Sequence, residues 1–267
     1  MSDPGHWEGR VAVVTGGCSG IGRATALALG RRGVRVLCLD RQSPQGPIDE
    51  WNELQIEFLE CDVTRQSQLA ESLNWMATKA GGIDILVNNA GIGMVKPAVE
   101  VTESDWDACM DVNLKAMFFG CRHVIPLMKS RGGGSIVNVA SNAGLLPRSH
   151  DPVYSISKMA AVGLTRSLAL CHSVDRIRIN AVCPGPVGNT GMMDADLDQA
   201  SDREVAVQSF IAASPLARAE GRMIEPSEVA DSIVYLCSDA ALMVTGTMIA
   251  IDGGKSLGVP PVPARNP

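Results

Sequence analysis

The stretch VAVVTGGCSGIG, residues 11–22, decides which fold the sequence predicts. Its opening run VAVVT is short, apolar and rich in valine, which is typical of a buried strand. The glycines of the loop that follows allow a tight turn and a close approach of the backbone to a ligand. A helix that begins at about Ile21 would present its amino end to that ligand, where an anion such as pyrophosphate is stabilised. Ser19 stands where the GxGxxG pattern has a glycine, so the stretch alone indicates a strand–loop–helix unit and leaves its ligand open.

Further apolar runs rich in valine and isoleucine extend this pattern, at residues 34–39, 83–88, 135–140, 177–182 and 247–251. Segments of helix length separate most of them, and this alternation is typical of parallel strands joined by crossover helices. The chain therefore predicts an α/β fold in a single domain, a doubly wound (Rossmann-type) parallel sheet with helices on both faces. We expect its core over about residues 9–255 and a proline-rich tail over 256–267. The link between residues 40 and 53 contains two prolines and a glycine, so any helix there should be short or broken.

Composition narrows the range of partners. With a net charge of −6 and no cluster of lysine and arginine, the sequence predicts no nucleic-acid or membrane partner. The opening MSDPGHWEGR lacks the regions of a signal peptide, and no apolar run approaches the length of a membrane span, so we expect a cytoplasmic protein. The eight cysteines are scattered without a CxxC pair, so we expect neither a disulfide framework nor a metal site. A small molecule is the simplest ligand.

Asp40 follows the second apolar run, 18 residues beyond Gly22. An acid at about this distance from a glycine loop accepts the ribose hydroxyls of NAD, and its charge opposes the 2′-phosphate of NADP. The adjacent Arg41 is a cation that could offset this repulsion, so NADP stays open as the second cofactor. The other interpretation of Asp40 is a plain turn residue, because a Ser-Pro pair lies close behind it.

The stretch YSISK, residues 154–158, places one of the two tyrosines of the chain four residues before a lysine. On a helix, Tyr154 and Lys158 would share one face about one turn apart, so phenol and ammonium could act on the same small volume. This spacing is also common on solvated helix faces and by itself decides little. Ser141, directly after the run at 135–140, would emerge at the same sheet edge as the glycine loop.

Taken in order along the chain, these motifs resemble those of the short-chain dehydrogenase/reductase family over nearly the whole length. The matching segments are TGGCSGIG at 15–22, CDVT at 61–64, NNAG at 88–91, Ser141, YSISK at 154–158 and IDGG at 251–254. The resemblance implies a nicotinamide-dependent alcohol or carbonyl oxidoreductase, commonly a homotetramer. It also implies a catalytic tetrad of Asn113, Ser141, Tyr154 and Lys158. By the same resemblance the cofactor would be held by Gly16, Ser19, Gly20, Ile21, Gly22, Asp40, Asp62, Val63, Asn89, Ala90, Gly91, Tyr154, Lys158, Pro184, Gly185, Val187, Asn189 and Thr190.

A tyrosine can transfer the proton that this chemistry requires, provided that its pKa falls. A free phenol has a pKa near 10, and lowering it by about three units requires about 4 kcal/mol. One cation about 4 to 5 Å away, at an effective dielectric constant near 20, supplies roughly 3 to 4 kcal/mol. We therefore expect Lys158 to lower the pKa of Tyr154 and to reach the nicotinamide ribose, while Ser141 holds the substrate oxygen.

Asn113 is the fourth expected catalytic residue. A helix over about residues 103–130, with Thr102 and Asp105 in a capping-box pattern, would carry an apolar stripe on which Asn113 falls. A polar side chain on a buried stripe must find partners. These are either backbone groups of the core or, as the resemblance implies, a water-linked proton relay to Lys158. The stripe consists of Trp106, Met110, Met117, Cys121, Val124 and Met128.

Two departures from the family pattern leave the substrate open. PGPVGNT, residues 184–190, has one extra residue before its threonine, so either Asn189 or Thr190 could reach the carboxamide of the nicotinamide. The connection after PLAR, residues 215–218, is longer than usual. We therefore expect an irregular substrate lid over about residues 186–225.

The segments near the expected substrate give few hints. Arg148 could meet a carboxylate or a polyol, but we interpret it as an exposed loop residue, and His150 as a loop residue rather than a ligand. Met192 and Met193, at the start of the lid, suggest an adaptable apolar wall.

The sequence favours an NAD-dependent oxidoreductase that interconverts a secondary alcohol (a small alcohol, a polyol or a sugar-like compound) and its ketone. One alternative, which Arg41 permits, is an NADPH-dependent ketoreductase acting on 3-oxoacyl thioesters. Another is a regulator that senses the dinucleotide without turnover, although such a protein would be expected to lose Tyr154 or Lys158. Apolar residues beyond one stripe on the helices at about 103–130 and 154–172 predict a homo-oligomer, and the resemblance implies a tetramer. These residues include Phe118, Phe119, Met159 and Leu164.

Overall fold

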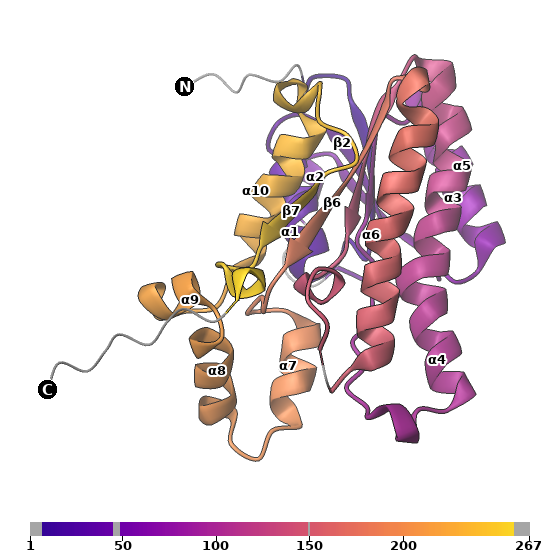
Figure 1. Ribbon diagram of the computed structural model, residues 1–267. Helices are drawn as coiled ribbons and strands as arrows, with labels where there is room; N and C mark the ends of the chain where they lie inside the picture. Colours follow the sequence, from indigo (N-terminus) through magenta and orange to yellow (C-terminus); the bar gives the residue numbers. More distant parts are fainter. Residues whose placement is uncertain (1–6, 45–48, 149, 259–267) are drawn as a thin grey trace, which may run out of the picture.

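The computed structural model describes residues 7–44, 49–148 and 150–258. Its centre is a sheet of seven strands in the order β3-β2-β1-β4-β5-β6-β7 (Figure 1). Neighbouring strands pair in parallel throughout. The chain order reverses between β1 and β4, so the fold is doubly wound, as predicted. The strands are β1 (Val11–Thr15), β2 (Arg35–Asp40), β3 (Ile56–Glu60), β4 (Ile85–Asn88), β5 (Gly134–Val139), β6 (Ile177–Pro184) and β7 (Met248–Ile251).

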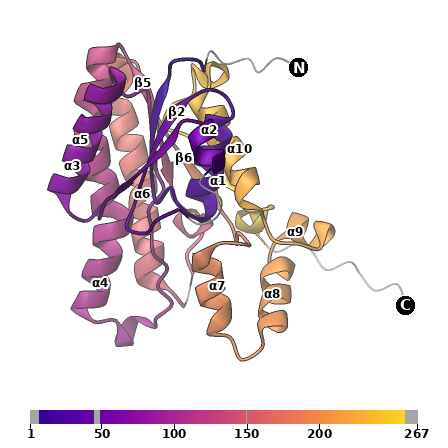
Figure 2. The same cartoon turned by 180° about the vertical axis from the view of Figure 1, so that it is seen from behind.

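Helices cover both faces of the sheet. The α-helices are α1 (Gly20–Gly30), α2 (Asp49–Glu53), α3 (Gln66–Ala80), α4 (Glu103–Met110), α5 (Ala116–Arg131), α6 (Pro152–His172), α7 (Gly191–Asp198), α8 (Arg203–Ala212), α9 (Pro215–Glu220) and α10 (Pro226–Cys237). Figures 1 and 2 show α1, α2 and α10 on one face and α3, α5 and α6 on the other. Shorter 3-10 turns lie at Ala98–Glu100, Asn142–Gly144, Ser173–Asp175, Asp239–Ala241 and Lys255–Leu257.

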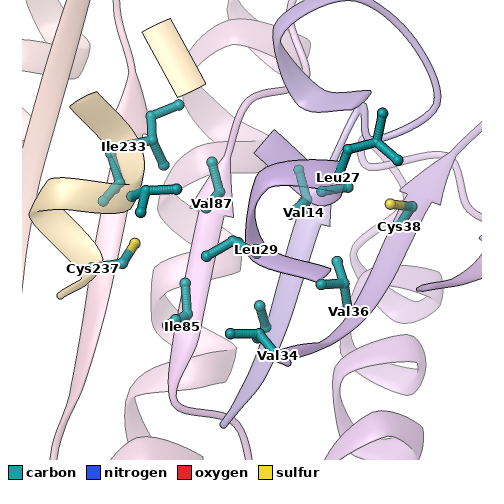
Figure 3. Close-up of a cluster of buried hydrophobic side chains, with 14 of the residues drawn as sticks. Val14, Leu27, Leu29, Val34, Val36, Cys38, Ile85, Val87, Ile233 and Cys237 are labelled. Carbon is teal, nitrogen blue, oxygen red and sulfur yellow. The ribbon is translucent and has the colours of Figure 1, made fainter. Parts of the chain in front are cut away.

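The two faces of the sheet bury separate hydrophobic clusters, because successive side chains of a strand point to opposite faces. Val14, Leu29 of α1 and Ile233 of α10 belong to the cluster on one face (Figure 3). Val13, one residue earlier, belongs to the other cluster, together with Leu73 of α3. Burial of a large apolar side chain contributes about 1.5 to 3 kcal/mol, so these clusters hold the sheet between its two helix layers.

Strand β3 is absent from the sequence prediction, which recognised only the more continuous apolar runs. Its residues mix apolar and charged side chains, and only Ile56 among them is buried. β3 lies at the edge of the sheet, so it does not need the continuous apolar character of a central strand. The link before it contains the five-residue helix α2, in agreement with the short helix predicted, and residues 45–48 lie outside the described ranges.

The helix predicted over about 103–130 is present but interrupted. Thr102 and Asp105 form the predicted capping box at the start of α4. A π-helical turn, Asp111–Lys115, then widens the helix and changes which residues face the core. Trp106 is 40% exposed, whereas Asn113, inside the turn, is fully buried. The prediction of one continuous buried stripe was therefore wrong at its amino-terminal end.

Residues 186–225, the expected lid, fold largely as α7, α8 and α9. These helices lie beyond the carboxyl ends of the strands (Figure 1). A parallel bridge between Val187 and Ile224 ties the two ends of this segment together. Of the expected tail, residues 256 and 257 belong to a 3-10 turn, and residues 259–267 lie outside the described part. Within the described ranges, no helix combines the length and the apolar character needed to cross a membrane.

Candidate functional site

A cleft of about 390 Å³ opens at the carboxyl ends of the strands and is bounded by residues of α7. Parallel strands end at the same edge of the sheet, which is why residues far apart in the sequence meet there. Gly22, Asn113 and Asn189 are the predicted site residues that do not line it. The predicted residues that do line it are Gly16, Ser19, Gly20, Ile21, Asp40, Asp62, Val63, Asn89, Ala90, Gly91, Ser141, Tyr154, Lys158, Pro184, Gly185, Val187 and Thr190.

Hydrogen bonds join the loop after β1 to the loop after β4 at the base of this cleft. The Thr15 hydroxyl accepts bonds from the backbone N–H groups of Asn89 and Ala90, at 3.0 and 3.1 Å. The Asn89 side-chain amide donates to the carbonyls of Thr15 and Gly16, at 3.0 and 2.9 Å. The absence of a side chain at Gly22 makes the hydrogen bond between Asn89 and the Gly16 carbonyl possible. A Cβ atom at residue 22 would lie 2.0 Å from that carbonyl oxygen. Gly22 therefore serves the packing of α1 against the loop.

The glycine loop fits a dinucleotide phosphate. Gly16 and Gly20 have φ angles of +62° and +49°, in the left-handed region that favours glycine. Ser19 and Ile21 line the cleft between and beyond them, where α1 begins. The first N–H groups of a helix have no intrahelical acceptor, so the start of α1 and the positive end of its macrodipole suit an anion.

Asp40 ends β2 and lines the cleft beside Arg41. One carboxylate oxygen accepts a hydrogen bond from the Cys18 backbone N–H at 3.1 Å, and the other accepts one from the Gln42 N–H at 3.2 Å. Two backbone donors thus fix the orientation of the carboxylate. Because a carboxylate offers about four acceptor sites, Asp40 can still accept bonds from a pair of hydroxyls.

Tyr154 and Lys158 lie one turn apart on α6 and both line the cleft, as their spacing predicts. The Lys158 Nζ atom lies 5.7 Å from the centre of the Tyr154 ring and donates to the Val139 carbonyl oxygen at 3.0 Å. Burial lowers the pKa of Lys158 to about 8. Burial raises the pKa of Tyr154 above its usual value, and a hydrogen bond with the Ser141 side chain acts in the opposite direction. The predicted lowering of the phenol pKa by Lys158 is therefore not found here, because burial dominates.

Arg148 is a second cation beside the phenol, and its interpretation as an exposed loop residue was wrong. Its side chain is only 25% exposed, and its guanidinium carbon lies 5.3 Å from the centre of the Tyr154 ring. The buried carboxylate of Asp151 holds it there through an ion pair of 2.5 Å. Although burial has the largest effect on the pKa of Tyr154, the charge of Arg148 lowers it. His150 is an exposed loop residue, as expected.

A buried chain of hydrogen bonds fixes α6 against the strands. Asn88 of β4 donates to Asn138 of β5 at 2.9 Å, and Asn138 donates to the Thr165 hydroxyl of α6 at 2.9 Å. Each of these three side chains is at most 4% exposed. Because an unpaired buried polar group is costly, this chain specifies one position of α6 on the sheet. It thereby sets the position of Tyr154 relative to Ser141.

Asn113 is held by backbone and side-chain partners. Its amide binds the backbone of Ile92 in both directions, accepting at 2.8 Å and donating at 3.0 Å, and it also donates to Ser157 Oγ at 3.2 Å. Ser157 donates to the Tyr154 carbonyl oxygen at 2.7 Å. The contacts of Asn113 thus match one of the two interpretations of the sequence, a core amide bonded to the backbone. The role of Asn113 in a proton relay stays a prediction.

The extra residue in PGPVGNT turns Asn189 away from the cleft. Asn189 has a left-handed backbone, with a φ angle of +53°, and its side-chain amide donates to the Glu225 carboxylate at 3.1 Å. Thr190 lines the cleft instead, and its Cγ2 atom lies 3.2 Å from the place of a Cβ atom on Gly20. Of the two residues that the sequence left open, Thr190 is the one within reach of a ligand in the cleft.

Two carboxylates of the cleft were missed by reasoning from the sequence. Asp151 directly precedes Pro152 at the start of α6, and an acid before a proline is a common helix start, so this pattern could have indicated it. Asp196 lies on α7 and reaches the cleft only through the packing of that helix. Across the part of the chain that the structure describes, no three or more His, Cys, Asp or Glu residues are grouped so as to hold a metal ion.

Comparisons with known proteins agree with this arrangement. A family model described as short chain dehydrogenase matches residues 10–201. The 3-oxoacyl-acyl-carrier-protein reductase FabG of Thermotoga maritima is 37% identical over 251 residues, which cover 92% of this chain and 98% of the relative. The cis-4-hydroxycyclohexanecarboxylate dehydrogenase of Sinomonas cyclohexanicum is 35% identical over 252 residues, which cover 92% of this chain and 96% of the relative. The solved structure of the aldohexose dehydrogenase of Thermoplasma acidophilum superimposes with a TM-score of 0.87 at 31% identity, covering 97% of this chain and 99% of that one.

Gly22→Ala should weaken dinucleotide binding by about tenfold or more, because the new methyl group would collide with the Gly16 carbonyl and push the loop out of place. Gly163→Ala on α6 is the matched control, since nothing lies within 4 Å of its Cβ position. Titration of both variants with NADH, followed by fluorescence, measures the affinity. An unchanged affinity in Gly22→Ala would contradict the role given to this contact.

Proposed function

The chain belongs to the short-chain dehydrogenase/reductase family, and on this premise we propose that it is an NAD-dependent oxidoreductase that interconverts a secondary alcohol and its ketone. The observation that carries the proposal is the meeting of Tyr154, Lys158 and Asp40 in one cleft. The first two supply a proton-transfer group and a neighbouring cation, and the third supplies an acceptor for ribose hydroxyls. The aldohexose in the name of one relative supports a sugar-like or polyol substrate, and the hydroxycyclohexanecarboxylate in the name of another supports only a secondary alcohol as the reacting group.

The proposed oxidation divides two hydrogens of the alcohol between cofactor and protein. NAD+ would supply the hydride acceptor. Tyr154, as a phenolate, takes the proton from the alcohol oxygen, while the Ser141 hydroxyl holds that oxygen by a hydrogen bond. Lys158 and Arg148, which lie 5.7 and 5.3 Å from the centre of the ring, would stabilise the phenolate against the cost of burying its charge. In the direction of reduction, Tyr154 returns the proton to the ketone oxygen.

Asp40 supports NAD over NADP. A 2′-phosphate on the adenine ribose would approach a carboxylate that two backbone N–H groups hold in place, so repulsion could not be relieved by a simple rotation. Arg41, which lines the same cleft, supports NADPH as the alternative. Arg41 and the FabG relative are the two observations that support the second candidate function, an NADPH-dependent reductase of 3-oxoacyl thioesters.

We also propose a homo-oligomer, with a tetramer as the expected state. An apolar groove of about 510 Å³ lies between α5 and α6, with Phe118, Phe119 and Leu164 among its lining residues. Phe118 is 42% exposed and Met159 is 37% exposed. Association with another copy of the chain would remove this surface from water, which supports the proposal.

Asp40→Ala should relax the preference for NAD+ over NADP+ by about tenfold or more, because it removes a hydroxyl acceptor and a repulsive charge together. Glu60→Ala is the control, since Glu60 pairs with Asp40 in the register of β2 and β3 and is not among the residues lining the cleft. Initial rates with each cofactor and one oxidisable alcohol give the ratio. Equal use of both cofactors by the unmutated protein would refute the NAD proposal.

Tyr154→Phe should lower turnover by about 10² to 10⁴-fold, the usual contribution of a general acid or base, and leave dinucleotide binding nearly intact. Tyr235→Phe, which removes the other tyrosine, is the control. Steady-state rates and cofactor titration by fluorescence separate the two effects. Near-normal turnover by Tyr154→Phe, at any pH, would remove the phenol from the mechanism.

Lys158→Ala should lower both cofactor affinity and rate, and should move the oxidation profile to higher pH. Oxidation needs the phenolate, and loss of a cation raises the pKa of Tyr154, so activity should appear only in more alkaline solution. Because burial lowers the pKa of Lys158 to about 8, its charge is present below that pH and is lost above it. The deficit of Lys158→Ala in pH-dependent turnover should therefore shrink as the pH rises through 8. A deficit that is constant across pH would show that geometry, and not charge, is what the variant lost; partial rescue by Lys158→Arg would favour charge.

A further inference from the structure

Helix α7 carries three carboxylates, and one of them differs from the others. Asp194 and Asp198 lie one turn apart and both pair with Arg203, at 2.6 and 2.5 Å. Asp196 lies on the other side of the helix, where it lines the cleft. No hydrogen bond or ion pair involves its carboxylate among the described residues. An ionisable side chain that is half-buried in a cleft without a partner is a candidate for contact with a ligand.

The surroundings of Asp196 suit a ligand better than water. Asp196 stands between the main cleft and an adjoining cavity of about 260 Å³ that separates α7 from residues 91–95. Burial raises the pKa of this carboxyl, so its environment already disfavours the bare charge. Met193 and Phe210 line the same cleft and offer apolar surface for a carbon skeleton. A donated hydrogen bond from a ligand would satisfy the carboxylate.

Carboxylates outnumber cations by one at this end of the cleft. Arg148 pairs with Asp151, whose side chain is 2% exposed, so the guanidinium already has its counter-ion. Lys255 and Asp196 lie close enough to this pair for their charges to interact with it. Asp252, whose charge also interacts with Lys255, adds a third carboxylate, so two cations and three carboxylates leave a formal charge of −1. An anionic group placed at Arg148 would face two carboxylates, and a cationic group at Asp196 would face two cations. A neutral group with hydroxyls meets neither repulsion and can donate to Asp196.

We propose that Asp196 accepts a hydrogen bond from a second hydroxyl of a neutral, polyhydroxylated substrate, a polyol or a sugar, whose reacting alcohol lies against Tyr154. The inference rests on the proposed function, because it takes Tyr154 as the place of proton transfer. It goes further by naming the residue that selects the substrate and the class that it selects. Asp196 is then a specificity-determining residue, and the anionic alcohols are the class that the site rejects.

The experiment compares matched rings with the unmutated protein and NAD+. The probes are cyclohexanol, its 1,2-, 1,3- and 1,4-diols, and the corresponding hydroxycyclohexanecarboxylates, followed by linear polyols and aldohexoses. We expect the best diol or sugar to exceed both cyclohexanol and every hydroxycarboxylate in kcat/KM. A hydrogen bond to a charged group changes kcat/KM by about ten- to a hundredfold, which sets the size of the expected preference.

Variants of α7 test the residue itself. Asp196→Ala should reduce the ratio of kcat/KM for the diol to that for cyclohexanol by about ten- to a hundredfold, and Asp196→Asn, which keeps an acceptor without the charge, should reduce it less. Asp194→Ala is the matched control on the same helix, since its partner Arg203 retains Asp198. The ratio in Asp194→Ala should stay within about twofold of that of the unmutated protein. A ratio is measured because a purely structural role would lower both rates together.

The outcomes separate this inference from the proposed function. Oxidation of cyclohexanol without any gain from a second hydroxyl, or an unchanged ratio in Asp196→Ala, would overturn the inference and leave the dehydrogenase proposal standing. A preference for a hydroxycarboxylate would overturn it in favour of an anion bound at Arg148. No oxidation of any probe by a protein that binds NAD+, with no reduction of the matching ketones, would overturn the proposed function and this inference with it.

Discussion

The hydrogen bonds between Thr15 and Asn89 hold together the two halves of the doubly wound sheet at its carboxyl edge. β1 and β4 are neighbours there, and the strand order runs outward from them in opposite directions. Separation of the two loops would leave polar groups unpaired in a partly buried position, which is costly. The rest of the cleft is placed relative to this junction. Asp40 follows it one strand away on one side, and Ser141 follows it one strand away on the other.

Buried hydrogen bonds also position the phenol of Tyr154, the proposed proton-transfer group. Through Asn138, strands β4 and β5 hold α6 in position, and Tyr154 stands in the first turn of that helix, where the macrodipole is positive. Arg148, a hydrogen bond with the Ser141 side chain and this helix end favour the phenolate. Burial and the carboxylates of Asp151 and Asp196 oppose it. The pKa of Tyr154 is therefore set by a balance of large opposing effects, and a positively charged ligand beside the ring would shift that balance toward the phenolate.

The sequence was sufficient for the parts of the structure that short segments determine. Continuous apolar runs and a glycine loop predicted the doubly wound sheet, and one helical turn between Tyr154 and Lys158 predicted their shared face. Strand β3 was not predicted, because an edge strand does not need a continuous apolar run. Arg148 was interpreted wrongly, and Asp196 was missed, for a different reason. Their place in the cleft depends on an ion pair and on the packing of α7, contacts across elements that local spacing does not encode.

The chain has only two tyrosines, and this makes the central claim directly measurable. In a Tyr235→Phe protein, Tyr154 is the sole phenol, so absorbance at the phenolate band reports its ionisation alone as the pH is raised. The account predicts a pKa above the usual value near 10 without cofactor, because burial dominates, and a clear downward shift when NAD+ is bound. A pKa of Tyr154 that NAD+ leaves unchanged would contradict the claim that this phenol works as the proton-transfer group beside the nicotinamide.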